Sequence, residues 1–305
     1  MLMEKYPRTP HLRGSGLQKG DEDAAIVKYE DLAGLRIVVE EKVDGANAGI
    51  SFPDAVPRLQ SRGHYLDGGA RERQFSRLKK WTDRHADALF DVLGDRYLLF
   101  GEWMAVKHSL FYDALPHLFM EFDVRDRLND RFLSTEARQD LLAELPIVSV
   151  PVLYAGPAPK RFEDLAKLVS PSLCRTERWR ENLRTAATRA GVSPERAAAE
   201  TDPSKLMEGL YVKIEKGNET VGRVKFVRRD FVQTIIDGGA HWSERPMIAN
   251  GLAPEVDLDA DSISWATPGL FGRDRDGRPL RPESVEAVLE VPKVERKNRG
   301  KEYER

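Results

Sequence analysis

Lys42 is the residue whose type and position most directly suggest chemistry. It follows the apolar residues of a predicted strand and precedes a strong turn signal, within the run Glu41-Lys42-Val43-Asp44-Gly45-Ala46-Asn47. An unprotonated lysine amine is a nucleophile, provided that burial or nearby positive charge lowers its pKa from the usual value of about 10.4. A lysine at a strand end can equally be a solvated charge. This segment by itself therefore does not decide between the two interpretations.

Five further segments place charged or aromatic side chains at the ends of predicted strands. Arg62 stands before a turn glycine, Glu102 follows an apolar strand, and an aromatic ring and an acid follow another strand at Phe122 and Asp123. A later strand begins after the carboxylate of Glu208 and ends at the amine of Lys213. In the next strand, alternation directs Arg223 and Lys225 to one face.

The elements that must position these side chains are mostly strands. The patterns predict two strands around a turn over 35–52, single strands over 58–61, 97–100 and 118–124, and a hairpin of 209–215 with 220–227. A helical repeat over 71–93 predicts one helix, and 134–200 is read mostly as helices. This order of elements predicts an α+β fold of mainly antiparallel sheets flanked by helices.

Composition limits the class of protein. A chain of 305 residues can form one large domain, alone or with a small appendage, and its single cysteine, Cys174, excludes an internal disulfide framework. The net charge of -2 means that any nucleic acid must bind to local basic patches. No apolar run approaches the roughly 20 residues of a membrane span, and the first residues lack a secretory signal pattern. We therefore expect a soluble, cytoplasmic protein with no membrane partner.

The six segments, in their order, resemble the motifs of the covalent nucleotidyltransferase superfamily, which contains ATP-dependent DNA ligases, RNA ligases and mRNA capping enzymes. The closest likeness is to the RNA ligases that include the phage-type enzymes sealing nicked duplex RNA, because the form E-K-x-D-G-x-N includes Asn47. The resemblance covers about 35–230. It implies a nucleotidyltransferase (ATP-grasp-like ligase) domain over 1–235 and a small family-specific module over 236–292. The polar residues 293–305 are predicted to be a disordered basic tail.

The resemblance also implies an activity and its residues. An ATP-dependent RNA ligase attaches AMP to a lysine, transfers it to an RNA 5′-phosphate and seals that end to a 3′-hydroxyl. The implied catalytic residues are Lys42, Lys213, Arg223 and Lys225. The implied nucleotide-binding residues are Glu41, Lys42, Asn47, Arg62, Glu102, Phe122, Lys213 and Lys225. Glu208 and Asp123 are the candidate ligands for Mg²⁺ or Mn²⁺, and the cations together with the metal are expected to lower the pKa of Lys42.

One position departs from the family pattern, and several alternatives stay open. The last motif usually carries two lysines, whereas the first is Arg223 here, which cannot donate a proton at neutral pH. DNA ligases add an OB-fold after this motif, and the Pro- and Asp-rich residues 232–305 show no run of alternating strands. A DNA nick ligase of the same superfamily and a catalytically inactive nucleic-acid-binding relative are the alternatives. The resemblance also suggests a polynucleotide kinase or phosphatase as a partner that prepares the RNA ends.

Overall fold

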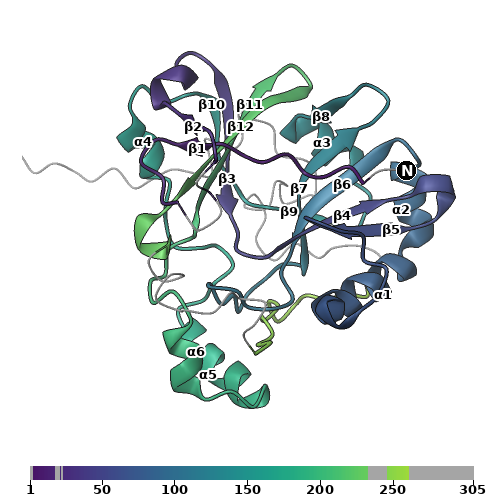
Figure 1. The fold of residues 1–305 in the computed structure, drawn as a ribbon, viewed down its shortest axis with the longest axis vertical. Helices are drawn as coiled ribbons and strands as arrows, with labels where there is room; N and C mark the ends of the chain where they lie inside the picture. Colours follow the sequence, from purple (N-terminus) through teal and green to yellow (C-terminus); the bar gives the residue numbers. More distant parts are fainter. Residues whose placement is uncertain (1–2, 18–20, 22, 233–245, 261–305) are drawn as a thin grey trace, which may run out of the picture.

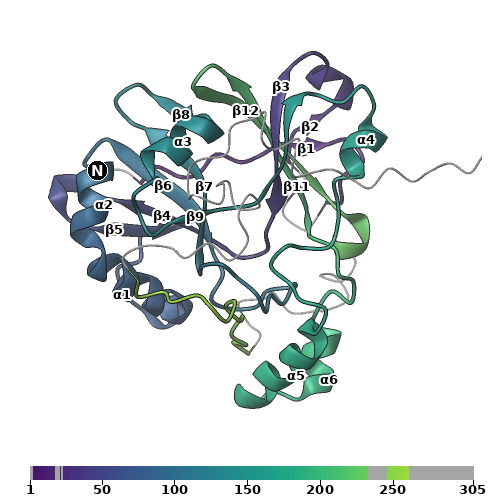
Figure 2. The same ribbon diagram turned by 180° about the vertical axis from the view of Figure 1, so that it is seen from behind.

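Strands from across the sequence form one large sheet in the computed structural model, which describes residues 3–17, 21, 23–232 and 246–260 (Figures 1 and 2). The main path of the sheet runs β10-β3-β11-β12-β8-β7-β6-β4-β5, and all neighbours on this path are antiparallel. The short strands β1, β2 and β9 add parallel pairs at its margins. The strands are β1 (His11–Leu12), β2 (Ile26–Val27), β3 (Arg36–Lys42), β4 (Ala46–Ser51), β5 (Arg58–Ser61), β6 (Tyr97–Trp103), β7 (Phe119–Asp126), β8 (Arg131–Leu133), β9 (Val148–Ser149), β10 (Val152–Pro157), β11 (Gly209–Lys216) and β12 (Glu219–Val227).

The helices are short and lie around this sheet. Figure 1 shows α1 and α2 beside β4 and β5, whereas α5 and α6 pack on each other away from the strands. The α-helices are α1 (Ser76–Arg84), α2 (Ala86–Leu93), α3 (Thr135–Leu141), α4 (Phe162–Ala166), α5 (Trp179–Arg189) and α6 (Pro194–Ala199). The 3₁₀ turns are η1 (Tyr29–Leu32), η2 (Pro53–Ala55) and η3 (Ala70–Phe75). No helix in the described ranges is both long and apolar enough to cross a membrane.

The prediction of an α+β fold with mainly antiparallel strands is confirmed, with two local corrections. The single helix predicted over 71–93 is wrong, because a 3₁₀ turn precedes α1 and a break at His85 (φ -103°, ψ 17°) separates α1 from α2. At this break the Trp81 ring packs against the rings of His85, His117 and Phe119, a tertiary contact that the helical repeat does not contain. The strands β9 and β10 interrupt the region interpreted as mostly helical.

The sheet has two halves that separate beyond a short junction. Strand β12 pairs with β8 only at Glu219↔Leu133 and Thr220↔Phe132, and beyond these residues the β3-β11-β12 half and the β7-β6-β4 half have no strand pairing. Figure 1 shows the two groups of strands splayed apart. A space therefore opens between them, and it is lined by residues from both halves.

Alternation along the strands decides which side chains face this space. In the β3-β11-β12 half, one face buries a cluster that contains Ile37, Val39, Leu210, Val212 and Val224. The intervening residues of the same strands lie on the opposite face, and strand register aligns Glu40, Tyr211 and Lys225 as neighbours across it. The apolar alternation that forms the core thus also collects the polar groups on one surface.

Gly209 allows the close approach of strands beside Lys42. It pairs with Lys42 on β3, and a Cβ atom at this position would lie 1.9 Å from the Phe226 carbonyl oxygen. We expect Gly209→Ala to reduce the free energy of unfolding by about 3 kcal/mol, because the backbone of β12 must move. Urea unfolding measures this difference. Gly63→Ala is the control, since a Cβ at Gly63 meets no atom within 4 Å. Equal stability of the two variants would contradict the prediction.

Candidate active site

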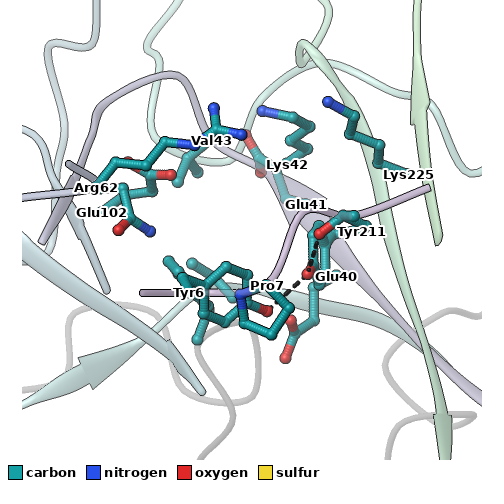
Figure 3. Close-up of a pocket in the computed structure, with 14 residues that line it drawn as sticks. Tyr6, Pro7, Glu40, Glu41, Lys42, Val43, Arg62, Glu102, Tyr211 and Lys225 are labelled. Carbon is teal, nitrogen blue, oxygen red and sulfur yellow. Dashed lines mark hydrogen bonds between the residues drawn. The ribbon is translucent and has the colours of Figure 1, made fainter. Parts of the chain in front are cut away.

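A pocket of about 710 Å³, including space open to solvent, lies between the two halves of the sheet (Figure 3). In Figure 3, Lys42 and Lys225 lie on one side of this pocket and Arg62 and Glu102 on another. Seven of the eight predicted nucleotide-binding residues line it, all except Lys213. The lining residues are Tyr6, Pro7, Thr9, Glu40, Glu41, Lys42, Val43, Asn47, Arg62, Glu102, Phe122, Val150, Tyr211 and Lys225.

Lys42 is held by a carboxylate. Its Nζ lies 2.8 Å from Oε1 of Glu208, and its side chain is 22% exposed. Burial lowers the pKa of Lys42, but Glu208, Glu102 and Asp44 outweigh this effect, and the pKa is raised above its ordinary value. The protein groups alone therefore raise this pKa, because those closest to the amine are acids, and the expected lowering by a metal together with the cations stays a prediction.

The two glutamates near Lys42 are themselves perturbed. Burial raises the pKa of Glu102 to about 8 and that of Glu208 to about 7, although the charge of Lys42 opposes both shifts. In each residue, the buried Oε2 has no hydrogen-bond partner in the protein. Both carboxyl groups are therefore ready to bind a hydroxyl group, a cation or a proton.

Asp44 and Gly45, which follow Lys42, make contacts that fix the turn at the end of β3. The Asp44 carboxylate accepts hydrogen bonds from the backbone N–H groups of Ser109 and Leu110, both at 2.7 Å, so it anchors the loop after β6. The Asp44 backbone N–H donates to the Tyr112 hydroxyl at 2.8 Å. A Cβ on Gly45 would lie 2.5 Å from Met104 Sδ and 2.9 Å from the Trp103 carbonyl oxygen. This turn therefore locks the end of β3 to the neighbouring loop.

Glu41 and Lys225 reach the pocket differently. The Glu41 carboxylate accepts hydrogen bonds from Ser172 Oγ at 2.5 Å and from the Leu173 N–H at 3.2 Å, and burial raises its pKa to about 7. Lys225 Nζ lies 3.4 Å from Asp21, and both burial and the charge of Lys42 lower the pKa of Lys225. Of the two amines at the pocket, Lys225 is therefore the one that loses its proton more easily.

Four predicted site residues do not line the pocket: Glu208, which pairs with Lys42, and the buried group of Lys213, Arg223 and Asp123. Arg223 donates through Nε to Asp123 at 2.8 Å, and Lys213 lies 3.4 Å from the same carboxylate and 3.1 Å from Glu40. Burial raises the pKa of Asp123, but Lys213 and Arg223 outweigh it and hold that pKa at about 2. These charges, together with Glu40, pair with one another beneath the pocket, whereas the prediction places Lys213 and Arg223 at the phosphates and Asp123 at the metal.

Sequence reasoning missed the wall formed by Tyr6, Pro7, Thr9 and Tyr211. Tyr211 had a usable signal, because it alternates with Lys213 and so shares its face of β11. The N-terminal residues had none, since their segment reaches the pocket only through tertiary folding. The Tyr6 ring packs edge-on against Phe122 at 5.1 Å between centroids, so this wall and the predicted base-stacking ring form one aromatic corner.

The acidic groups permit only a limited metal site. Among the described residues, no group of three or more His, Cys, Asp or Glu side chains is arranged to hold a metal ion. Mg²⁺ commonly binds one or two carboxylates and completes its shell with water and phosphate oxygens. Glu208 fits this role, because it has a buried oxygen without a partner. Asp123 does not fit, because its carboxylate is paired with Arg223 and Lys213.

Comparison with known proteins identifies the family. The family model described as RNA ligase matches residues 35–227, which is more than half of the chain. The chain therefore belongs to the RNA ligase family, and the prediction of this family is confirmed. No curated protein matches the sequence.

Solved structures of an RNA ligase from Naegleria gruberi are similar to this chain at low identity. An apo variant is 18% identical, with a TM-score of 0.45, over 68% of this chain and 54% of that chain. Another variant, with ATP and Mn, is 16% identical, with a TM-score of 0.47, over 76% of this chain and 58% of that chain. This chain thus spans little more than half the length of these proteins.

The perturbed carboxyl groups predict a dependence of stability on pH. The pKa of Glu102 is about 8 in the folded chain against an ordinary value of 4.5, so folding favours the protonated form. Below pH about 4.5 Glu102 is protonated in both the folded and the unfolded chain, so its burial does not change the free energy of unfolding. As the pH rises from 4.5 towards 8, the unfolded chain loses this proton first and the free energy of unfolding falls. We expect Glu102→Gln to match the parent protein at pH 5 and to exceed its unfolding free energy at pH 9 on the order of 2 kcal/mol.

Urea unfolding between pH 5 and pH 9 tests this expectation. Glu163→Gln, at the exposed start of α4, controls for the chemical change itself. A difference between Glu102→Gln and the parent protein that stays constant with pH would contradict the assignment.

Proposed function

We propose that this chain is an ATP-dependent RNA ligase that carries AMP covalently on Lys42. The observation that carries the proposal is the convergence of Lys42, Glu102, Arg62 and Lys225 on one pocket with an aromatic corner. Membership of the RNA ligase family supports it. The DNA nick ligase and the inactive relative remain as outcomes of the tests below.

The first step joins the amine to the nucleotide. Lys42 Nζ attacks the α-phosphorus of ATP, an N–P bond forms, and the bond from that phosphorus to the pyrophosphate oxygen breaks with its electron pair. The Lys42 ammonium must first lose a proton, which the Glu208 ion pair at 2.8 Å opposes. A divalent cation bound to Glu208 would weaken that pair and lower the pKa of the amine. Lys225 lines the same pocket, and its ammonium form is suited to neutralise the phosphate, whose negative charge would in turn raise the lowered pKa of Lys225.

The remaining steps return the lysine and close the strand. An oxygen of the RNA 5′-phosphate displaces Lys42 from the AMP phosphorus, so the amine is regenerated. A 3′-hydroxyl oxygen then attacks the 5′-phosphorus and gives its proton to solvent, and AMP leaves with the electrons of the broken P–O bond. Such in-line displacements depend mostly on positioning and charge neutralisation. A preformed pocket with fixed cations is suited to that task.

We assign the nucleotide contacts residue by residue. The free buried oxygen of Glu102 is suited to accept a ribose hydroxyl, and Arg62 and Asn47 line the pocket near it. Phe122 offers a ring for the base. Lys213, Arg223 and Asp123 take a positioning role in this proposal, because their charges are paired with one another below the pocket. Arg223 then needs no acidic proton, which removes the difficulty raised by its replacement of a family lysine.

The wider assignments also belong to this proposal. RNA with a 5′-phosphate and a 3′-hydroxyl is the substrate, a kinase or phosphatase is a partner that prepares the ends, and the cytoplasm is the location. The catalytic domain spans 1–235. Of the proposed module 236–292, the structure describes 246–260, which packs on the loop after β6 through contacts such as Gly251 N–H to the Tyr112 carbonyl at 2.8 Å. The predicted tail 293–305 lies outside the described residues.

Covalent adenylylation is the direct test of the mechanism. Incubation with ATP and Mg²⁺ or Mn²⁺ should add the mass of one AMP to the intact protein. Lys42→Ala should abolish the adduct, because no other amine replaces the nucleophile. Lys216→Ala, at the exposed end of β11, should retain it and serves as the control. No adduct on the parent protein would exclude the enzyme and favour the inactive relative, and an adduct on Lys42→Ala would assign another nucleophile.

Strand preference separates an RNA ligase from a DNA ligase. Matched nicks that differ only in an RNA or DNA 3′-hydroxyl end should be sealed faster with the RNA end, and single-stranded RNA ends extend the comparison. Gel assays of sealing measure the rates. Faster sealing of the DNA end would favour the DNA nick ligase while leaving the lysyl-AMP mechanism intact.

A further inference from the structure

We propose that the hydroxyl groups of Thr9, Tyr211 and Tyr6 select the base of the nucleotide by accepting its amino group. This inference rests on the proposed function and assigns the base specificity of the same pocket. Thr9 and Tyr6 lie outside residues 35–227, so the family match does not assign them. The three hydroxyl groups are called the hydroxyl series below.

The hydroxyl series lies where a base would bind. All three residues line the pocket, beside Phe122 and Pro7. Tyr211 Oη lies 2.6 Å from Tyr6 Oη and 2.9 Å from Thr9 Oγ1, and the dashed lines in Figure 3 follow these contacts. The aromatic corner supplies apolar faces, and the hydroxyl series is the polar element attached to it. A planar base that stacks on an aromatic face needs such an element for specificity.

The hydrogen bond from Tyr6 to Asp123 determines which hydroxyl donates in each contact of the hydroxyl series. The Tyr6 hydroxyl donates to Asp123, whose carboxylate can only accept, because Arg223 and Lys213 keep it ionised. Tyr6 therefore has no second proton, and in the contact at 2.6 Å Tyr211 must be the donor. By the same argument, Thr9 must donate to Tyr211 in the contact at 2.9 Å.

The consequence is a wall that presents hydrogen-bond acceptors only. Each of the three protons is directed within the hydroxyl series or to Asp123, whereas each oxygen keeps an unused lone pair. A donor on the ligand, such as the 6-amino group of adenine, matches such a wall. A carbonyl oxygen at the same position finds no donor and loses its hydration without compensation. The hydroxyl series therefore selects a 6-amino purine over a 6-oxo purine.

Nucleotides that differ only at purine position 6 give the cleanest test. We expect the parent protein to form its covalent nucleotide adduct with ATP at least about tenfold more efficiently than with inosine triphosphate. The triphosphate of purine riboside, which has hydrogen at position 6, should fall between them. Efficiency is the apparent second-order rate of adduct formation, followed by intact mass at limiting nucleotide.

Two variants test the direction of the protons. Tyr211→Phe removes the central acceptor, so its efficiency with ATP should fall by about tenfold while that with inosine triphosphate changes little. Tyr6→Phe removes the group that receives the Tyr211 proton, so the Tyr211 hydroxyl becomes free to donate to a 6-oxo group. The efficiency of Tyr6→Phe with inosine triphosphate should therefore rise relative to ATP. If these tyrosines had a merely structural role, each substitution would lower the efficiency with ATP and with inosine triphosphate by the same factor.

Tyr29→Phe is the matched control. Its hydroxyl donates to the Pro159 carbonyl at 2.6 Å and does not line the pocket, so the ratio of the two nucleotides should not change. Equal use of ATP and inosine triphosphate by the parent protein, a preference for GTP, or an unchanged ratio in Tyr6→Phe would overturn the inference. If Tyr211→Phe does not fold, equal use of ATP and purine riboside triphosphate by the parent protein overturns it. The absence of an adduct with every nucleotide would instead refute the proposed function.

Discussion

A buried network of ion pairs beneath the pocket is the constraint on which the site depends. Arg138, fully buried on α3, donates to both Glu40 on β3 and Glu121 on β7, so it joins the two halves of the sheet from below. Lys213 and Asp123 extend the network on the same level. Removing one partner from such a network leaves an unpaired buried charge, which typically costs about 3–5 kcal/mol. The spacing of the strands around the pocket is therefore not free to vary.

The charged groups of this network, here called the lower layer, differ in their pKa values and partners from the groups around Lys42, here called the upper layer. In the lower layer, acids and bases are matched, and the pKa of Asp123 is held at about 2. In the upper layer, Lys42 shares its surroundings with Glu208 and Glu102, whose carboxyl groups have raised pKa values and unpartnered oxygens. In the lower layer the charged groups face opposite charges of the protein. In the upper layer the unpartnered oxygens of Glu102 and Glu208 belong to groups that surround Lys42, where a ligand can satisfy them. The upper layer is therefore the part suited to bind a ligand, and the lower layer is the part that holds the strands in place.

Segments far apart in sequence complete the site from outside the matched family region. The described segment 246–260 fixes the loop after β6: Asn250 donates to the Met104 carbonyl at 2.8 Å and accepts from the Tyr112 N–H at 3.0 Å. That loop is in turn held by Asp44, two residues from the nucleophile. At the other end of the chain, Tyr6 links the aromatic corner to Asp123. The lysine turn and the base corner are therefore both supported by residues beyond 35–227.

The sequence by itself was sufficient to predict the longer strands that carry the motifs, the α+β class, the family and half of the residues that line the pocket. These depend on local patterns: alternation directs side chains to one face, and an ordered set of motifs carries the chemistry of the family. Tertiary structure decided what these patterns do not contain. Arg223 and Lys225 share a face as predicted, yet Arg223 lies beside Asp123 and is neutralised there, whereas Lys225 reaches the pocket. The pKa of Lys42 rises because strand pairing brings Glu208 to it. Charge, depth and hydrogen-bond direction arise from contacts between distant segments, and no local pattern records them.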